Sequence, residues 1–139
     1  MKGTRYRLAF PEKQAVIRRL AEELQSRKEV AFAYLHGTFT EDMPFHDVDV
    51  GIYLSGISEA EAGIFAVELA SKLTRSVELE VDVRVLNFAP VSFVYHVICG
   101  EVLFERLADD RIQFIENAVH QYLDIKPVLY RAMKEAFTP

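Results

Sequence analysis

The chain contains almost no cysteine and has no excess of basic residues. Cys99 is the single cysteine among 139 residues, so no internal disulfide can form, and a disulfide-stapled secreted scaffold is excluded. Sixteen Lys and Arg against 21 Asp and Glu give a net charge of -5. This acidic balance argues against broad nonspecific binding to nucleic acid, and we expect no direct nucleic-acid partner.

Long hydrophobic runs are also missing. Residues 1–7 lack the apolar core of a signal peptide, and no stretch is long and apolar enough to span a membrane. We therefore expect a cytoplasmic protein without a membrane partner. Apolar residues make up 50% of the chain, which excludes a disordered protein, and the length suits a single domain over residues 1–139.

Two common nucleotide-binding signatures are absent as well, namely the G-x-G-x-x-G dinucleotide turn and the Walker lysine motif. Helical and strand patterns instead alternate along the chain, which predicts a mixed α/β sheet packed with helices. Strands are expected near residues 30–36, 47–54, 78–86 and 102–105. Helices are expected over 11–26, 58–74 and 90–99, with a long C-terminal helix that Asp110 and Gln113 cap and Pro127 kinks.

Two expected helices carry apolar stripes. The stripe of the first comprises Ala15, Ile17, Leu20, Ala21 and Leu24. The buried face expected for the second, which Ser58 and Glu61 cap, comprises Ile64, Val67, Leu69, Ala70 and Leu73.

The segment 36–51 is the most informative part of the chain, because it places two carboxylates one residue apart after a glycine turn. Side chains alternate along a strand, so Asp47 and Asp49 share one face while Val48 and Val50 point toward the core. Adjacent carboxylates repel each other unless a cation or a shared proton neutralises them. Oxygen ligands of this kind suit magnesium bound together with a substrate phosphate, although Asp-x-Asp alone is also common on solvated strand edges.

A third carboxylate follows on the alternating strand pattern 78–85. If this strand lies beside the Asp47 strand, Asp82 or Glu80 can join the pair. Three converging acids with bridging metals support in-line displacement at phosphorus.

Four other residues carry weaker signals. His36 and His46 flank the turn, and we expect hydrogen bonds or phosphate contacts from them rather than metal ligation. Cys99 is expected to be a small apolar core residue rather than a nucleophile. Arg84 can neutralise phosphate, but it can equally be a surface charge or a partner of Glu78 and Glu80.

Gly37-Thr38, the short loop, Asp47-Val48-Asp49 and the later Asp82 resemble the minimal nucleotidyltransferases of the DNA polymerase beta superfamily. The pattern there is Gly-Ser, a loop of roughly ten residues, Asp-x-Asp and a third Asp. The segments 83–90 and 95–105 are similar to the region after the third acid in small MntA-like members.

The resemblance implies a nucleotidyltransferase fold with magnesium held by Asp47, Asp49 and Asp82 and the nucleotide gripped at Gly37 and Thr38. It also implies transfer of AMP from ATP to a tyrosine of a HEPN-domain ribonuclease toxin, with this chain as the antitoxin. A family member of this kind is a magnesium-dependent enzyme, and its partners are the toxin and ATP. The resemblance does not say whether the protein also forms homo-oligomers.

The motif also departs from the family pattern. Thr38 stands where serine is usual and keeps the hydroxyl, whereas Thr40-Glu41-Asp42 replaces Ala-Arg-Gly and brings two acids beside the expected triphosphate. The alternative function is therefore a catalytically decayed antitoxin that neutralises a HEPN partner by binding alone. An aminoglycoside-type small-molecule transferase is a weaker match, because such enzymes usually add a further domain.

Overall fold

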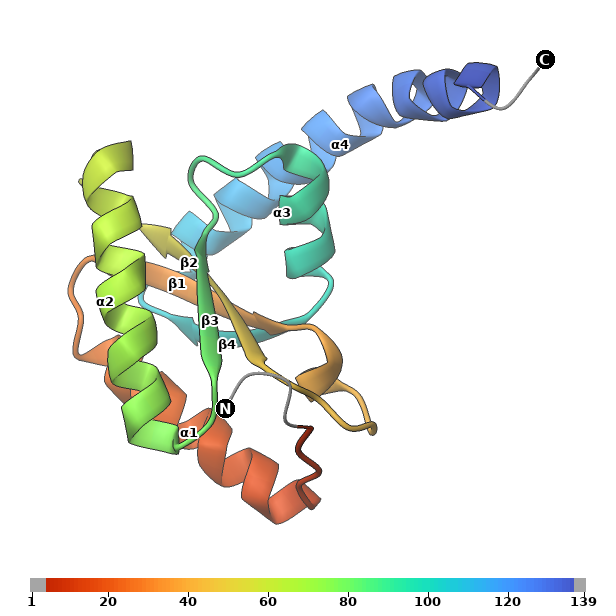
Figure 1. The fold of residues 1–139 in the computed structure, drawn as a ribbon. Coiled ribbons are helices and arrows are strands. Elements are labelled where there is room, and N and C mark those ends of the chain that lie inside the picture. The colour runs from red at the N-terminus through yellow and green to blue at the C-terminus, as the bar shows by residue number, and fades with distance from the viewer. Residues whose placement is uncertain (1–4, 137–139) are drawn as a thin grey trace.

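The computed structural model describes residues 5–136 and contains one four-stranded sheet flanked by helices (Figure 1). The elements are α1 (Phe10–Gln25), β1 (Val30–His36), a short 3-10 turn η1 (Thr38–Thr40), β2 (Val48–Leu54), α2 (Glu59–Val77), β3 (Val81–Val85), α3 (Val91–Ile98), β4 (Glu101–Glu105) and α4 (Ala108–Ala136). The strand order is β3-β2-β1-β4. β2 and β3 are parallel, whereas β1 pairs antiparallel with both β2 and β4, so the predicted mixed α/β sheet is confirmed.

β1 is the centre of the fold. All seven residues of the strand are buried, because it has a neighbour on each side and helices on both faces. A strand in this position needs apolar side chains on both faces, which explains the continuous apolar run before His36.

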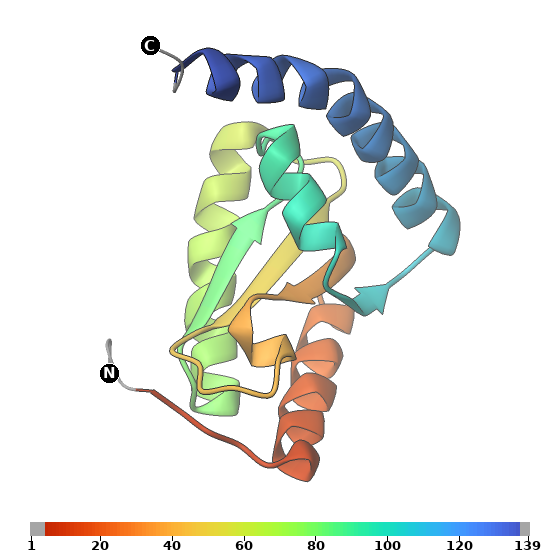
Figure 2. The ribbon, with the colours of Figure 1, turned by 90° about the vertical axis from the view of Figure 1, so that its right-hand side faces the viewer.

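The two faces of the sheet have separate cores. α1 and α2 cover one face, where Leu20 and Leu73 pack with Val48, Val50 and Ile52 of β2. α3 and the first part of α4, with Phe114 and Ile115, cover the other face, whereas the rest of α4 extends away from the sheet (Figure 2). Side chains alternate along β2, so the residues between the core valines, such as Gly51, face α3. A Cβ on Gly51 would stand 2.8 Å from Cγ1 of Val97, so the helix packs closely on the strand here.

The predicted residues end or cap two of the helices, but not α4. Ser58 caps α2, since its side chain accepts a hydrogen bond from the Glu61 backbone N–H and donates to the Glu61 carboxylate. Gly100 follows the end of α3, as predicted. The expected cap at Asp110 and Gln113 is wrong, because α4 already begins at Ala108. Pro127 lies within α4, which runs through it and curves in Figure 2.

Two further expectations need correction. The third strand is shorter than predicted, because α2 continues to Val77 and Glu78 takes the left-handed conformation that ends this helix. On α2 the apolar face is rotated: Ile64 and Val67 are 64% and 72% exposed, whereas Ala62 and Ala66 are buried with Leu69 and Leu73. Small alanines let the helix approach the sheet closely. No helix within residues 5–136 is long and apolar enough to cross a membrane.

Candidate active site

Asp49 lies at the centre of a polar cluster on the α3 side of the sheet. In the strand register it pairs with His36 of β1 on one side and with Asp82 of β3 on the other. Residues in register on neighbouring strands point to the same face, so these three side chains project together. Asp47 precedes β2 by one residue and shares the face of Asp49 by alternation.

The turn after β1 closes directly onto this carboxylate. Gly37 has a φ of +80°, and a Cβ at this position would lie only 2.2 Å from Oδ2 of Asp49. The backbone conformation therefore favours glycine, and any side chain here would displace the Asp49 carboxylate. The η1 turn follows at once, so Thr38 starts beside the acid cluster.

Electrostatic crowding is strongest at Asp49. Its burial, followed by the negative charges of Asp82 and Asp47, raises the pKa of the Asp49 carboxyl to about 6. Arg84 and His96 act in the opposite direction but do not compensate. Such crowding is costly for the apoprotein and is relieved when a cation binds between the carboxylates.

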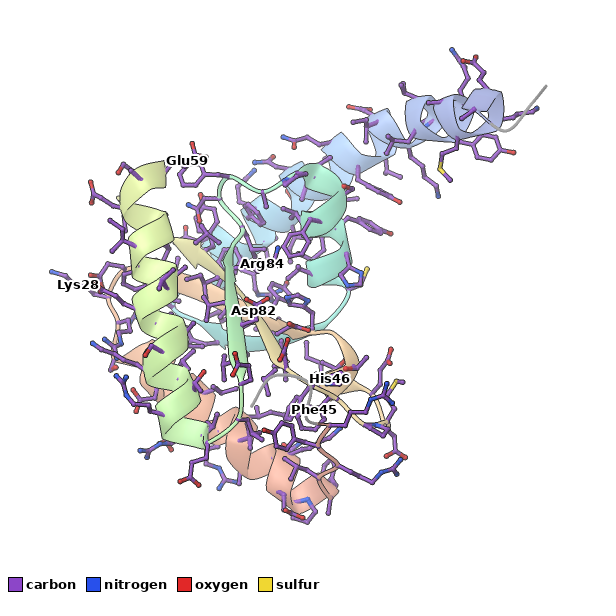
Figure 3. All side chains as sticks on the ribbon, viewed as in Figure 1. Lys28, Phe45, His46, Glu59, Asp82 and Arg84 are labelled. Atoms are coloured by element: carbon purple, nitrogen blue, oxygen red, sulfur yellow. The ribbon has the colours of Figure 1, made fainter. Side chains whose placement is uncertain are left out.

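Asp82 already has a cationic neighbour. The Arg84 guanidinium donates from Nε to Oδ2 of Asp82 at 3.3 Å, from two positions further along β3 (Figure 3). Of the alternatives for Arg84, pairing with Glu78 or Glu80 is not seen, and the guanidinium pairs with Asp82 instead. Both side chains are substantially exposed, so this ion pair can open at little cost.

The acids form only part of a metal cage. Within residues 5–136, no three His, Cys, Asp or Glu side chains are arranged to hold a metal ion as they stand. Magnesium commonly takes one or two carboxylates and completes its octahedron with water and substrate phosphate. Asp47 and Asp49 fit that mode, and Asp82 can supply a third carboxylate once it leaves Arg84.

His36 is buried, with only 6% of its surface exposed. Burial and the nearby His96 lower the pKa of the His36 imidazole to about 4, against an opposite effect of Asp82. Its ring meets Phe93 and His96 of α3 edge-on, with centroids at 5.9 and 6.0 Å.

A pocket of about 410 Å³ lies beside the turn. Its lining residues come from the end of β1, the η1 turn and the end of α3: His36, Gly37, Thr38, Thr40, Glu41, His96, Cys99 and Gly100. Cys99 is exposed here, so its expected place in the core is wrong; it stands at the C-terminal cap of α3, where the helix leaves the sheet.

Lys13 of α1 holds the loop that departs from the family pattern. Its ammonium donates to the backbone carbonyls of Phe39 at 2.9 Å and Glu41 at 2.8 Å, and it lies 5.1 Å from the Phe39 ring centroid. The Glu41 and Asp42 side chains themselves are exposed. The loop thus has a fixed backbone even without the usual arginine.

The structure therefore brings Gly37, Asp47, Asp49 and Asp82 to one place, with Thr38 at the start of the adjoining turn. His46 is exposed on the loop before β2 and accepts a hydrogen bond from Nε of Arg5. Sequence spacing did not reveal the contributions of α3 and Lys13, because these are contacts between segments far apart in the chain.

Comparisons with known proteins agree with this geometry. The family model described as polymerase beta, nucleotidyltransferase matches residues 18–109, which is more than half of the chain. A search among curated proteins gave no significant match.

Solved structures give a similar fold at low sequence identity. A re-refined structure of a tri-AMPylated Shewanella oneidensis HEPN toxin in complex with MNT antitoxin matches with 19% identity and a TM-score of 0.63, covering 87% of this chain and 98% of that chain. The toxin–antitoxin MntA–HepT matches with 19% identity and a TM-score of 0.62, covering 86% and 98%. A toxin–antitoxin structure with AMP-PNP matches with 18% identity and a TM-score of 0.64, covering 84% and 98%. Together with the family match, the acid cluster beside a glycine turn leads to one conclusion: this chain belongs to the polymerase beta nucleotidyltransferase family.

Proposed function

We propose that the protein is a magnesium-dependent nucleotidyltransferase that transfers AMP from ATP to a protein hydroxyl, the acceptor being a tyrosine of a HEPN ribonuclease toxin. In this role it is an antitoxin, and residues 1–139 act as one catalytic domain in the cytoplasm. The observation that carries the proposal is the position of Asp49, in register with Asp82 and with its carboxylate against the Gly37 turn.

The acids have the chemistry to hold the metal. Asp47 and Asp49 would bind magnesium, with Asp82 as the third ligand after it separates from Arg84. When bound, the ion neutralises the triphosphate and activates the acceptor hydroxyl. The backbone of the turn at Gly37 and Thr38 would orient phosphate oxygens. Asp82 would help to accept the proton of the acceptor hydroxyl.

The protein partner is inferred from similar structures. One neighbour with the same fold is described as a tri-AMPylated HEPN toxin in complex with MNT antitoxin, and another as the toxin–antitoxin MntA–HepT. AMP-PNP in another toxin–antitoxin structure is consistent with ATP as the nucleotide. A toxin hydroxyl as the acceptor accounts for both the AMPylated toxin and the bound nucleotide analogue in these neighbours.

A second candidate function is neutralisation by binding alone. The observation that favours it is Glu41, which lines the pocket beside Gly37 and Thr38 where a triphosphate would bind. A carboxylate there repels phosphate unless it turns outward. Glu41 is exposed, and its backbone carbonyl accepts a hydrogen bond from Lys13, so its side chain is free to point outward.

The mass of the toxin separates these candidates. A HEPN partner incubated with the protein, ATP and magnesium should gain about 329 Da for each AMP, because pyrophosphate leaves in a metal-assisted displacement. Intact-mass spectrometry measures this gain, and tryptic mapping should place it on tyrosine. An Asp47→Asn/Asp49→Asn variant should neither add mass nor silence the ribonuclease. Full neutralisation by that variant with an unmodified toxin would instead establish the binding-only function.

A further inference from the structure

The long helix α4 exposes much of its apolar surface. Its second half extends away from the sheet (Figure 2), and large apolar side chains are exposed along the helix: Ile112, Leu123, Ile125, Val128, Leu129, Tyr130 and Met133. Single apolar residues scattered over a surface need no explanation, whereas a continuous apolar patch marks an interaction site. The spacing along the helix indicates which side a partner covers.

One row of residues runs along α4 on a side that the domain leaves uncovered. Its members follow one another at alternating steps of four and three residues, the repeat of a coiled-coil seam, and we call them the outer row: Ile112, Glu116, Val119, Leu123, Lys126, Tyr130 and Met133. The domain packs against a different row, in which Ala118 is buried and the Tyr122 ring stacks on Tyr95 of α3 with centroids 3.9 Å apart. In the outer row every side chain is exposed except that of the half-buried Val119.

The apolar members of the outer row match one another when the helix is reversed. Val119 and Leu123 lie equally far in sequence from Gln121 on either side, and so do Ile112 and Tyr130. In an antiparallel pair of α4 helices with a two-fold axis at Gln121, Leu123 therefore meets Val119 of the second copy. A two-fold contact between identical chains requires this self-matching, whereas contact with an unrelated protein does not.

The charged members of the outer row match in the same way, with opposite sign. Glu116 and Lys126 also lie equally far from Gln121, so the antiparallel pair brings the carboxylate of each copy to the ammonium of the other. Neither side chain makes an ion pair within residues 5–136. A parallel pair would instead set Glu116 against Glu116 and Lys126 against Lys126, so the charges favour the antiparallel arrangement.

We propose that the protein forms a homodimer in which the outer rows of two α4 helices pair antiparallel about a two-fold axis near Gln121. The contact spans residues 112–130 of each helix, a length of about 28 Å. No member of the outer row belongs to the acid cluster or lines the pocket beside Gly37, so the dimer contact is separate from the candidate active site.

Sedimentation equilibrium over a concentration series tests the dimer, and the wild type should approach twice the monomer mass. Leu123→Asp places a carboxylate in the apolar centre of the pair and should raise the dimer dissociation constant at least roughly 100-fold. Val128→Asp is the matched control, because Val128 is as exposed as Leu123 but lies on the opposite side of the same helix. This control should stay within roughly threefold of the wild type.

Charge reversal tests the antiparallel register. Lys126→Glu sets like charges opposite each other at two symmetric places and should raise the dissociation constant roughly 10- to 100-fold. The double variant Glu116→Lys/Lys126→Glu restores opposite charges and should return to within roughly fivefold of the wild type. Such recovery requires residue 116 of one copy to face residue 126 of the other, and a variant that merely fails to fold would not show it.

Three results would overturn the homodimer. These are a monomeric wild type, equal dissociation by Leu123→Asp and Val128→Asp, and no recovery in the charge-swapped double variant. If a monomeric wild type binds a HEPN toxin and Leu123→Asp does not, the outer row is a docking surface for the toxin instead. The proposed AMP transfer is judged separately by the mass of the toxin, so a monomer that modifies the toxin would overturn only the dimer.

Discussion

Asp49→Asn is expected to abolish AMP transfer and at the same time to stabilise the apoprotein. If Asp49 holds magnesium as proposed, its loss forfeits several kcal/mol of transition-state stabilisation, so the rate should fall at least about 10³-fold. Stability should change in the other direction, because the native environment raises the pKa of Asp49 from 3.8 to about 6.

The sign of the stability change follows from that shift. The native protein binds the Asp49 proton more tightly than the unfolded chain does, so the charged carboxylate destabilises the fold above pH 6. This penalty disappears as the pH falls through 6 toward 3.8. Asparagine lacks the charge, and we expect a gain of about 1–3 kcal/mol at pH 7 that vanishes near pH 4.

Thermal melts at both pH values, in the presence of a chelator, measure this gain. Glu59→Gln on α2, an exposed carboxylate outside the cluster, is the control for loss of a negative charge and should not show the same gain. A less stable Asp49→Asn protein at pH 7 would contradict the crowded-carboxylate account. Retained transfer would contradict the metal-ligand role.

Gly37→Ala is expected to have the second largest effect, because one methyl group acts on both fold and site. The backbone angle of +80° is strained for alanine, and the new Cβ would stand 2.2 Å from Oδ2 of Asp49. The Asp49 carboxylate must rotate away from its position, which displaces the metal ligand proposed above. We expect a loss of about 1–3 kcal/mol in the free energy of unfolding and at least tenfold weaker binding of magnesium ATP.

Gly63→Ala provides the matched comparison for chemical denaturation. Gly63 lies within α2, and a Cβ there has nothing within 4 Å, so the same change should stabilise the helix by about 0.5–1 kcal/mol. Nucleotide binding should be unaffected. Equal stability and equal nucleotide affinity of Gly37→Ala and the wild type would mean that the turn is not fitted to the acid.

Sequence patterns predicted the strands of the sheet and the proximity of the acidic side chains, because both depend on the alternation of side chains along a strand. The apolar run of β1 and the Asp-x-Asp spacing at Asp47 and Asp49 require no knowledge of distant contacts. Asp82 could be added because a single crossover through α2 brings β3 beside β2 in register.

Other features depend on packing between distant segments and could not be predicted in this way. The rotation of α2 that exposes Ile64 and buries Ala62 follows from how closely the helix approaches the sheet, which apolar periodicity does not specify. The exposure of Cys99 depends on where α3 leaves the sheet. The hydrogen bonds from Lys13 of α1 to the carbonyls of Phe39 and Glu41 join segments far apart in the sequence, and no local pattern predicts them.

The central claim is that the acid cluster beside Gly37 is a metal-dependent nucleotide site, and calorimetric titration of ATP with and without magnesium tests it most directly. Because Asp47, Asp49 and Asp82 repel a bare triphosphate, we predict that magnesium tightens ATP binding by at least about tenfold. The Asp47→Asn/Asp49→Asn variant should lose this difference. Equal ATP affinity in the presence and absence of magnesium would contradict the account.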